Sequence, residues 1–435
     1  MRRRARRRAR PNPYVAAFGG TVLQLGLGTV YAWSFFQSIL VKEHLWSYTD
    51  TAWAFSLVIL TLGISSAWAG VNLPKYGPRK LAMTGAALFS LSYVLGGTAL
   101  FLESVPLFLL GYGVVGGLGI GLGYVTPVAT VAKWFPRKSS TAIDVVVMGF
   151  GVGGLLMTMV LAPFLLFNVN GDLPRVFIAL GVIFAFVLIP ATWFLQNPPG
   201  RPTTAAATAA PDVRSAFADI GSVQFLGMWV VFFCNIVAGL AVISLQSSLL
   251  QEIWGLWDPS LQAAALARNG ATLIAIGSLC NGIGRLFWGT VSDHIGRIES
   301  FRLLLGTQIV MFGLLMTESN PQVFSALVCG VLLCFGGGFA TMPSFVADVF
   351  GARRMPVMYG AMLTAMAAAG VVGPLMAASL KDNYPDRAVI YCFLMGVGLL
   401  GVGFVVSFLV SNDAYRPGRP ALDDLGIPSA YLSKT

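Results

Sequence analysis

The chain has 435 residues, of which 56% are hydrophobic and 11% charged, with a net charge of +10 and a mean hydropathy of +0.76. An ordinary soluble domain carries about 25% charged residues, so this composition excludes a soluble enzyme, a secreted disulfide scaffold and a disordered chain. Long apolar runs alternate with short basic or Pro/Gly clusters. The sequence therefore predicts an all-α polytopic membrane protein.

Apolar runs and the breakers between them predict twelve transmembrane helices, since each crossing needs about 20 apolar residues. The predicted spans are Tyr14–Leu40, Thr51–Leu73, Leu81–Leu102, Pro106–Ala132, Ser140–Phe167, Val176–Leu195, Val223–Leu250, Ala263–Val291, Phe301–Met316, Gln322–Val346, Val357–Leu380 and Ala388–Val410. A polar stretch rich in Pro, Thr and Ala divides them six and six. The predicted organisation is a basic tail (1–13), an N-terminal six-helix bundle (14–195), a linker (196–222), a C-terminal six-helix bundle (223–410) and a second tail (411–435).

Positive charge is distributed unevenly between the two sides of the predicted bundle. With the N-terminus inside, 22 of the 28 Lys and Arg residues fall on the cytoplasmic side and 5 on the external side. This asymmetry predicts that both termini and the linker are cytoplasmic, in a bacterial inner membrane. The first ten residues hold seven arginines and abut the first span. We therefore expect them to contact anionic lipid and not nucleic acid.

The sequence contains an internal repeat. GVNLPKYGPR at 70–79 and GTVSDHIGR at 289–297 follow the second and eighth spans, with an offset of 219 residues. Independently, GLGYVTP ends at Pro127 and GGFATMP ends at Pro343, with an offset of 216. Two landmarks that agree within three residues predict two pseudo-symmetric six-helix halves, with a solute site near the midplane between them.

The second copy resembles the loop signature Gly-x-x-x-Asp-Arg-x-Gly-Arg of major facilitator superfamily transporters, with His294 in place of the first arginine. The first copy departs further, because Pro74 stands where the aspartate is expected. The resemblance implies a conformational latch at this signature, weaker on the side of the first copy. The matching residues are Gly70, Gly77, Arg79, Gly289, Asp293, Gly296 and Arg297.

A closer resemblance runs from about residue 26 to residue 410. It is carried by GTVYAWSFF (28–36), GLGIGLGYVTPVATVAKWFP (117–136), GFGVGG (149–154) and NGIGRLFWG (281–289). Together these segments are similar to the oxalate–formate antiporter family, including its bacterial lactate-type members, and more distantly to animal monocarboxylate transporters. The resemblance implies an alternating-access carrier of small organic anions in a bacterial inner membrane. We expect a monomer, because one chain of six plus six spans already encloses a cavity, and the residues predict no cofactor, metal or catalytic site.

Arg285 is the most informative single residue. An arginine within an apolar helix costs about 2.5–3.5 kcal/mol on insertion scales, so its presence indicates a function. Its fork can hold a carboxylate bidentately. The alternative is an arginine that snorkels to the nearby cytoplasmic end. The resemblance implies that Arg285 binds the substrate. Asn281, one turn earlier on the same face, replaces the aspartate of the animal transporters. It orients the arginine, bonds the substrate or joins two helices.

Met366 affects the expected charge of the substrate site, because it stands where related carriers have a lysine. In oxalate-transporting members the eleventh span resembles Thr-Ala-Lys-Gly, whereas here it reads Thr-Ala-Met-Ala at 364–367. One cation in place of two favours a monocarboxylate such as lactate, pyruvate, acetate or formate. A dicarboxylate–monocarboxylate exchanger is the alternative. The repeat offset pairs Met366 with Gly149, and we expect both to face the cavity.

Polar aromatic and amide side chains are further candidates for the lining of the path, although such a residue taken alone is more often a helix-packing residue than a ligand contact. The candidates are Tyr31, Tyr124, Phe335 and Phe339, followed by Trp33, Asn235, Gln246 and Tyr359. Asp144, early in the fifth span, either favours the positive N-terminus of its helix or relays a proton that moves with the substrate. The five cysteines form no CxxC pair and are expected to be apolar core residues.

Overall fold

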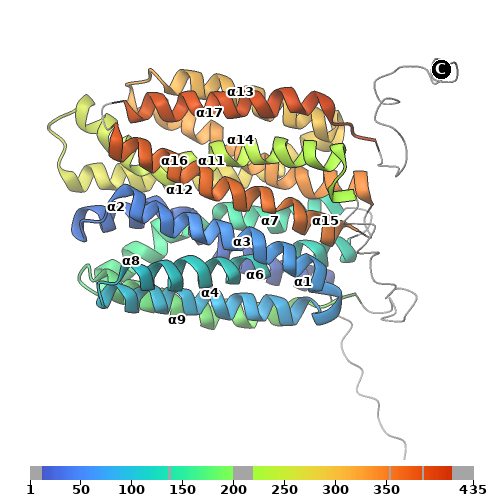
Figure 1. The fold of residues 1–435 in the computed structure, drawn as a ribbon. Coiled ribbons are helices and arrows are strands. Elements are labelled where there is room, and N and C mark those ends of the chain that lie inside the picture. Colours follow the sequence, from blue (N-terminus) through green and yellow to red (C-terminus); the bar gives the residue numbers. More distant parts are fainter. Residues whose placement is uncertain (1–11, 136–138, 199–218, 352–353, 385–386, 414–435) are drawn as a thin grey trace, which may run out of the picture.

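The computed structural model describes residues 12–135, 139–198, 219–351, 354–384 and 387–413 (Figure 1). Within these ranges the chain is helical, without strands, and twelve helical segments are long and apolar enough to cross a membrane. The predicted all-α fold with twelve spans is confirmed. Most of the predicted tails and linker (1–11, 199–218 and 414–435) lies outside the described residues.

The first six spans include three that change helical geometry part-way. Their elements are α1 (Pro13–Leu27), η1 (Gly28–Ala32) and α2 (Trp33–Glu43); α3 (Tyr48–Tyr76); α4 (Pro78–Phe101); α5 (Val105–Phe108), η2 (Leu109–Val115) and α6 (Gly116–Trp134); α7 (Ser139–Leu156), η3 (Met157–Leu161) and α8 (Ala162–Asn168); and α9 (Leu173–Ala191) with η4 (Thr192–Phe194). In the first span, η1 is a 3₁₀ turn that carries Tyr31. The π-helical η2 and η3 interrupt the fourth and fifth spans.

The last six spans are mostly continuous. Their elements are α11 (Val223–Trp257), α12 (Ala263–Ile295), α13 (Arg297–Leu315), α14 (Pro321–Phe350), α15 (Met355–Met362) with α16 (Thr364–Asn383), and α17 (Ala388–Val406) with η5 (Ser407–Leu409). Several of the twelve spans begin with a residue whose side chain accepts a hydrogen bond from the first N–H groups of the helix. Ser47 forms a capping box with Asp50 at the start of α3, and Asn320 caps α14 ahead of Pro321.

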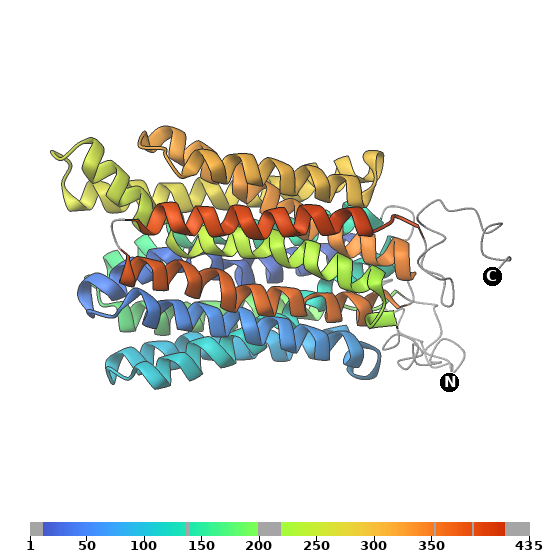
Figure 2. The same ribbon diagram turned by 45° about the horizontal axis from the view of Figure 1, so that its top comes forward.

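The helices run roughly side by side, so the bundle has two ends (Figure 1). We call the end where α1 begins and α17 stops the terminal end, and the opposite one the far end. The blue-to-green helices of the first half occupy one side of the bundle and the yellow-to-red helices the other. Helix α3 of the first half lies beside α16 of the second in both views (Figures 1 and 2).

The two most extensive seams between the halves are α3 against α15 and α16, and α7 against α12. Glycines allow close backbone approach in both. A Cβ on Gly63 would lie 2.6 Å from the carbonyl oxygen of Leu363, and one on Gly151 would lie 2.7 Å from the Cα of Gly282. Small residues permit such approach between membrane helices. The seams therefore bring side chains of the two halves into direct contact near the middle of the bundle.

Candidate functional site

Arg285 lies on α12 at the seam with α7 and is 0% exposed. A Cβ on Gly151 of α7 would meet its Nε at 3.1 Å. This Nε donates a hydrogen bond of 3.3 Å to Oδ1 of Asn281, one turn earlier on the same helix. The side chain thus points toward the N-terminus of α12, and its complete burial contradicts the snorkelling alternative. Asn281 therefore contacts the side chain of Arg285 in this structure.

Two aromatic rings flank the guanidinium, one from each half of the chain. Its central carbon lies 5.6 Å from the ring centroid of Phe150 on α7 and 5.0 Å from that of Phe339 on α14. A cation over an aromatic face gains about 0.5–2 kcal/mol, more where water is excluded. These rings hold the cation in place without neutralising it.

The two terminal nitrogens of Arg285 are buried and make no hydrogen bond of normal geometry to a described residue, and the hydroxyl of Tyr31 interacts directly with the guanidinium. Buried polar groups in native proteins are nearly always paired, and leaving a charged donor unpaired costs more than leaving a neutral one. The paired nitrogens of an arginine fork match the two oxygens of a carboxylate. The arrangement therefore presents a ready donor pair for an anionic group.

Three tyrosine hydroxyls lie around the same region, and each is buried without a hydrogen bond of normal geometry. The charge of Arg285 acts on the hydroxyls of Tyr31 and Tyr359, and the hydroxyl of Tyr124 is next to that of Tyr359. The rings of Tyr31 and Tyr124 both lie 5.0 Å from that of Phe150, edge to face. These hydroxyls can donate to the same ligand as Arg285.

Phe335 completes the set of rings. Its centroid lies 5.7 Å from that of Tyr31 and 5.1 Å from that of Phe339. Of the predicted lining residues, the structure brings together Arg285, Asn281, Tyr31, Tyr124, Phe335 and Phe339.

Phe150 was missed by the sequence reasoning, although GFGVGG contains it. The expectation that Gly149 faces the cavity is wrong, because a Cβ there would meet the carbonyl oxygen of Thr21 on α1 at 2.8 Å. Successive residues of a helix point about 100° apart, so Gly151, two residues further on, faces Arg285 instead. The two landmarks of the repeat give offsets of 219 and 216 residues. An uncertainty of three residues is too large to predict which face of a helix a residue occupies, because each residue turns the helix by about 100°.

Few charged side chains are buried in the described chain. They are Asp144, Asp219, Arg285 and Lys381. Asp219 pairs with Arg354 and Lys381 with Glu252, both away from the central rings. Met366 is 0% exposed on α16 and adds no charge. Of the two buried cations in the described chain, Lys381 is therefore paired with an acidic side chain and Arg285 is not.

Asp144 lies on α7 and is 2% exposed. Its carboxylate packs directly against α12, because a Cβ on Gly289 would meet Oδ2 at 2.2 Å. Gly289 follows Arg285 by four residues, about one helical turn toward the terminal end. Asp144 therefore faces the other half of the chain at the seam, one turn beyond Arg285.

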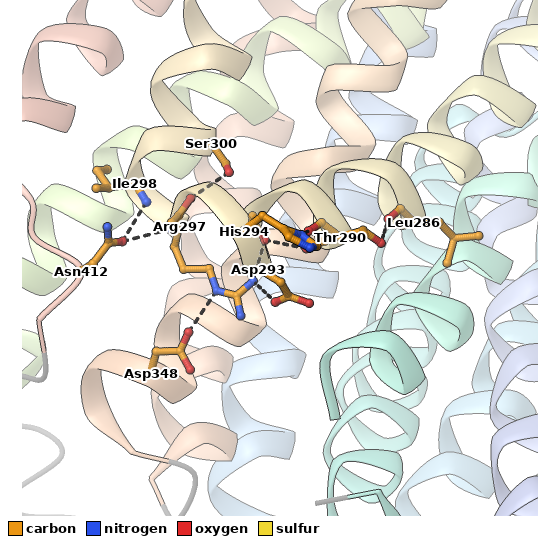
Figure 3. Close-up of polar contacts among 12 residues, drawn as sticks. Leu286, Thr290, Asp293, His294, Arg297, Ile298, Ser300, Asp348 and Asn412 are labelled. Carbon is orange, nitrogen blue, oxygen red and sulfur yellow. Dashed lines mark hydrogen bonds and ion pairs between the residues drawn. The ribbon is translucent and has the colours of Figure 1, made fainter. Parts of the chain in front are cut away.

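The second copy of the signature forms a network at the terminal end (Figure 3). Arg297 binds Asp293 at 2.6 Å and Asp348 on α14 at 3.0 Å. Its backbone N–H and that of Ile298 both donate to Oδ1 of Asn412, at 3.1 and 3.0 Å. All these residues belong to the second half, and the sequence reasoning missed Asp348 and Asn412. Across the seam, Gly289 makes the contact with α7 described above.

The signature lies mostly in helix ends and not in loops. Helix α12 extends through Ile295, and the chain turns at Gly296, whose φ is +99°. His294, in place of the usual arginine, folds its Nδ1 back to within 2.8 Å of the carbonyl oxygen of Thr290 (Figure 3).

The first copy has a different set of contacts. Helix α3 runs through Pro74 to the turn at Gly77, whose φ is +77°. The guanidinium carbon of Arg79 lies 5.8 Å from the ring centroid of Trp193 in the same half. A Cβ on Gly70 would lie 2.2 Å from the carbonyl oxygen of Pro356 in the other half.

The sequence profile of the Major Facilitator Superfamily matches residues 17–374. The chain belongs to this superfamily. It is 26% identical to the oxalate:formate antiporter of Oxalobacter formigenes, over 82% of each chain. It is 24% identical to apicoplast pyruvate carrier 1 of Toxoplasma gondii, over 81% of each chain. Among solved structures it resembles a D-xylose–proton symporter, with a TM-score of 0.67 and 15% identity over 93% of this chain and 99% of that one. This major facilitator is a multi-pass membrane transporter.

Proposed function

We propose that this major facilitator carries small monocarboxylates, such as lactate, pyruvate or formate, by alternating access across a bacterial inner membrane. The observation that carries the proposal is the fully buried Arg285 fork, held between rings of the two halves with no acidic partner and no hydrogen bond of normal geometry to its terminal nitrogens among the described residues. A carboxylate bound there would pair with the cation and accept from the surrounding tyrosine hydroxyls. The ligand would thus touch both halves, and their rocking would move it from one side to the other.

The number of cations favours a monoanion. A dianion at Arg285 would leave one carboxylate without a buried counter-charge, and an unpaired buried charge is costly. Lys381 does not fill this role, because Glu252 already neutralises it near the far end. The similarity to an oxalate:formate antiporter supports a second candidate, dicarboxylate–monocarboxylate exchange. The pyruvate carrier among the relatives supports the first.

Uptake into proteoliposomes tests the substrate class. We expect labelled lactate, pyruvate or formate to be taken up by the reconstituted protein and oxalate to compete poorly. An imposed pH gradient distinguishes symport with a proton from exchange. In symport an inward proton gradient drives net uptake into empty vesicles, whereas in exchange the labelled anion enters only when the vesicles are preloaded with unlabelled anion. Oxalate uptake that exceeds monocarboxylate uptake would promote the second candidate.

Asp144 is our candidate for the group that carries a co-transported proton, because its buried carboxylate lies at a seam that must open. Asp144→Asn keeps the shape and removes the titratable group. We expect net uptake driven by a pH gradient to fall at least about 10-fold while exchange of lactate for lactate persists, as the loss of a proton step leaves binding intact. The matched control is Asp172→Asn, a half-buried capping residue at the far end. Loss of exchange in Asp144→Asn would contradict a role confined to the proton.

We propose that the terminal end is cytoplasmic, as the excess of Lys and Arg on that side predicts. In a variant without native cysteines, Leu45→Cys at the far end should react with an impermeant maleimide in spheroplasts. Lys80→Cys at the terminal end should react only after the membrane is permeabilised. Both positions are exposed. The reverse labelling pattern would overturn the orientation.

A further inference from the structure

At the far end, a carboxylate of the second half binds the start of a helix of the first half. Oδ2 of Asp382, at the end of α16, accepts from the backbone N–H of Thr49 at 2.9 Å and from its hydroxyl at 2.5 Å. Thr49 is the second residue of α3, whose first N–H groups have no partner within the helix. Negative charge at a helix N-terminus is stabilised by the helix dipole. This contact therefore joins the halves by a charged hydrogen bond.

The contact adds to the cap that α3 already has. Ser47 Oγ accepts from the N–H of Asp50, which leaves the N–H of Thr49 for Asp382. Because α3 is capped by its own chain, the helix does not need Asp382 in order to begin. The bond between Thr49 and Asp382 serves the association of the two halves.

A second bond crosses between the halves beside the first. Nζ of Lys42, near the end of α2, donates to Oε1 of Gln251 on α11 at 2.9 Å. The other end of this amide is fixed, since its Nε2 donates to Ser247 Oγ at 3.1 Å. Gln251 is therefore oriented to receive the lysine of the first half.

Lys381 holds Asp382 in position. Its ammonium forms an ion pair with Glu252 of α11, and 7% of its side chain is exposed. This pair ties the end of α16 to α11 within the second half. The same ammonium lies 5.8 Å from the ring centroid of Tyr48, which precedes Thr49. The end of α16 is thus pinned on one side and faces the start of α3 on the other.

We propose that the bonds Thr49–Asp382 and Lys42–Gln251 form a far-end latch, which keeps this end of the path closed and breaks each time the central site opens toward it. The inference rests on alternating access in the proposed function and is independent of the substrate. Asp382 can accept from Thr49 only while the end of α16 lies directly beside the start of α3, so the latch breaks when these two helix ends move apart. Loss of the latch should shift the population toward carriers that are open at the far end.

Labelling of a reporter cysteine tests the latch without any substrate. Ser248 lies on α11, 9% exposed, and interacts with the side chain of Tyr48 across the boundary between the halves. In a background without native cysteines, Ser248→Cys should react slowly with a maleimide. Adding Asp382→Ala should raise the rate at least about 10-fold, because it removes the charged hydrogen bond that stabilises the closed state.

Asp258→Ala is the matched control. This carboxylate also lies at the far end, but it accepts hydrogen bonds from Ser260 in its own loop and not from the other half. We expect it to leave the labelling rate of the reporter unchanged. An unchanged rate in Asp382→Ala would overturn the latch, as would an equal rise in both variants.

A covalent bridge gives the opposite test. The double variant Thr49→Cys/Asp382→Cys, joined by a short bis-methanethiosulfonate that forms a disulfide with each cysteine, should be unable to open at the far end. The reporter Ser248→Cys cannot be used here, so the readout is uptake of the anion that the wild type carries, which should be lost on bridging and return when a reductant cleaves the bridge. Undiminished uptake by the bridged protein would overturn the latch. Failure of the wild type to carry carboxylates would instead overturn the proposed function and leave the labelling test valid.

Discussion

Arg285→Gln is expected to abolish saturable carboxylate uptake while the protein still inserts in the membrane. The glutamine keeps hydrogen-bonding capacity but removes the positive charge, and truncating one partner of a buried charge pair costs about 2–5 kcal/mol. We therefore expect affinity to fall at least about 30-fold. The measurement is uptake of labelled lactate by proteoliposomes that contain equal amounts of purified wild type and variant.

Two further variants separate charge from geometry. Arg285→Lys keeps the charge without the planar fork and should retain weak uptake, since a lysine cannot bind a carboxylate bidentately. Arg175→Gln removes an exposed arginine that pairs with Asp172, and it should transport normally. Wild-type uptake by Arg285→Gln would remove the basis of the proposed site.

Met366→Lys is expected to shift the preference of the carrier from lactate toward oxalate. The substitution adds a second buried cation on α16, where the oxalate-transporting proteins that this chain resembles carry a lysine. A dianion would then find two counter-charges, whereas a monoanion would leave one cation unpaired. We expect the ratio of oxalate to lactate uptake to rise at least about 10-fold, which corresponds to 1.4 kcal/mol. Competition of unlabelled oxalate against labelled lactate measures this ratio.

The lysine must be charged for this result, and burial opposes the charged form of a lysine. The competition is therefore repeated at lower external pH, where protonation is favoured. Met366→Leu, a swap of similar volume, controls for packing and should keep the wild-type preference. Oxalate that outcompetes lactate in the unmodified protein would reject the monocarboxylate proposal.

The sequence predicted those parts of the site that depend on a single helix. Asn281 and Arg285 are four residues apart, so their contact follows from helix geometry alone. The ring of Phe150 comes from the other half, and its place over the guanidinium depends on how α7 packs against α12. No periodicity within one span contains that information. For the same reason Gly149 was expected at the cavity where the structure has Gly151.

The fold itself was more predictable than its contacts. Twelve apolar runs and the repeat were sufficient for the arrangement of spans, because every crossing must be a long apolar helix. The partners of the signature residue Arg297 were not predictable, since Asp348 and Asn412 lie 51 and 115 residues away in the chain. The bond between Thr49 and Asp382 spans 333 residues. Such pairs are fixed by tertiary packing and carry no local pattern.

Binding of lactate and of its neutral amide to the purified carrier tests the central claim most directly. Lactamide has nearly the shape of lactate but no charge, so it cannot pair with the fork of Arg285. We predict that lactate displaces a bound labelled monocarboxylate from the wild type, that lactamide does not, and that Arg285→Gln binds neither. Equal binding of lactate and lactamide, or lactate affinity in Arg285→Gln equal to that of the wild type, would contradict the account.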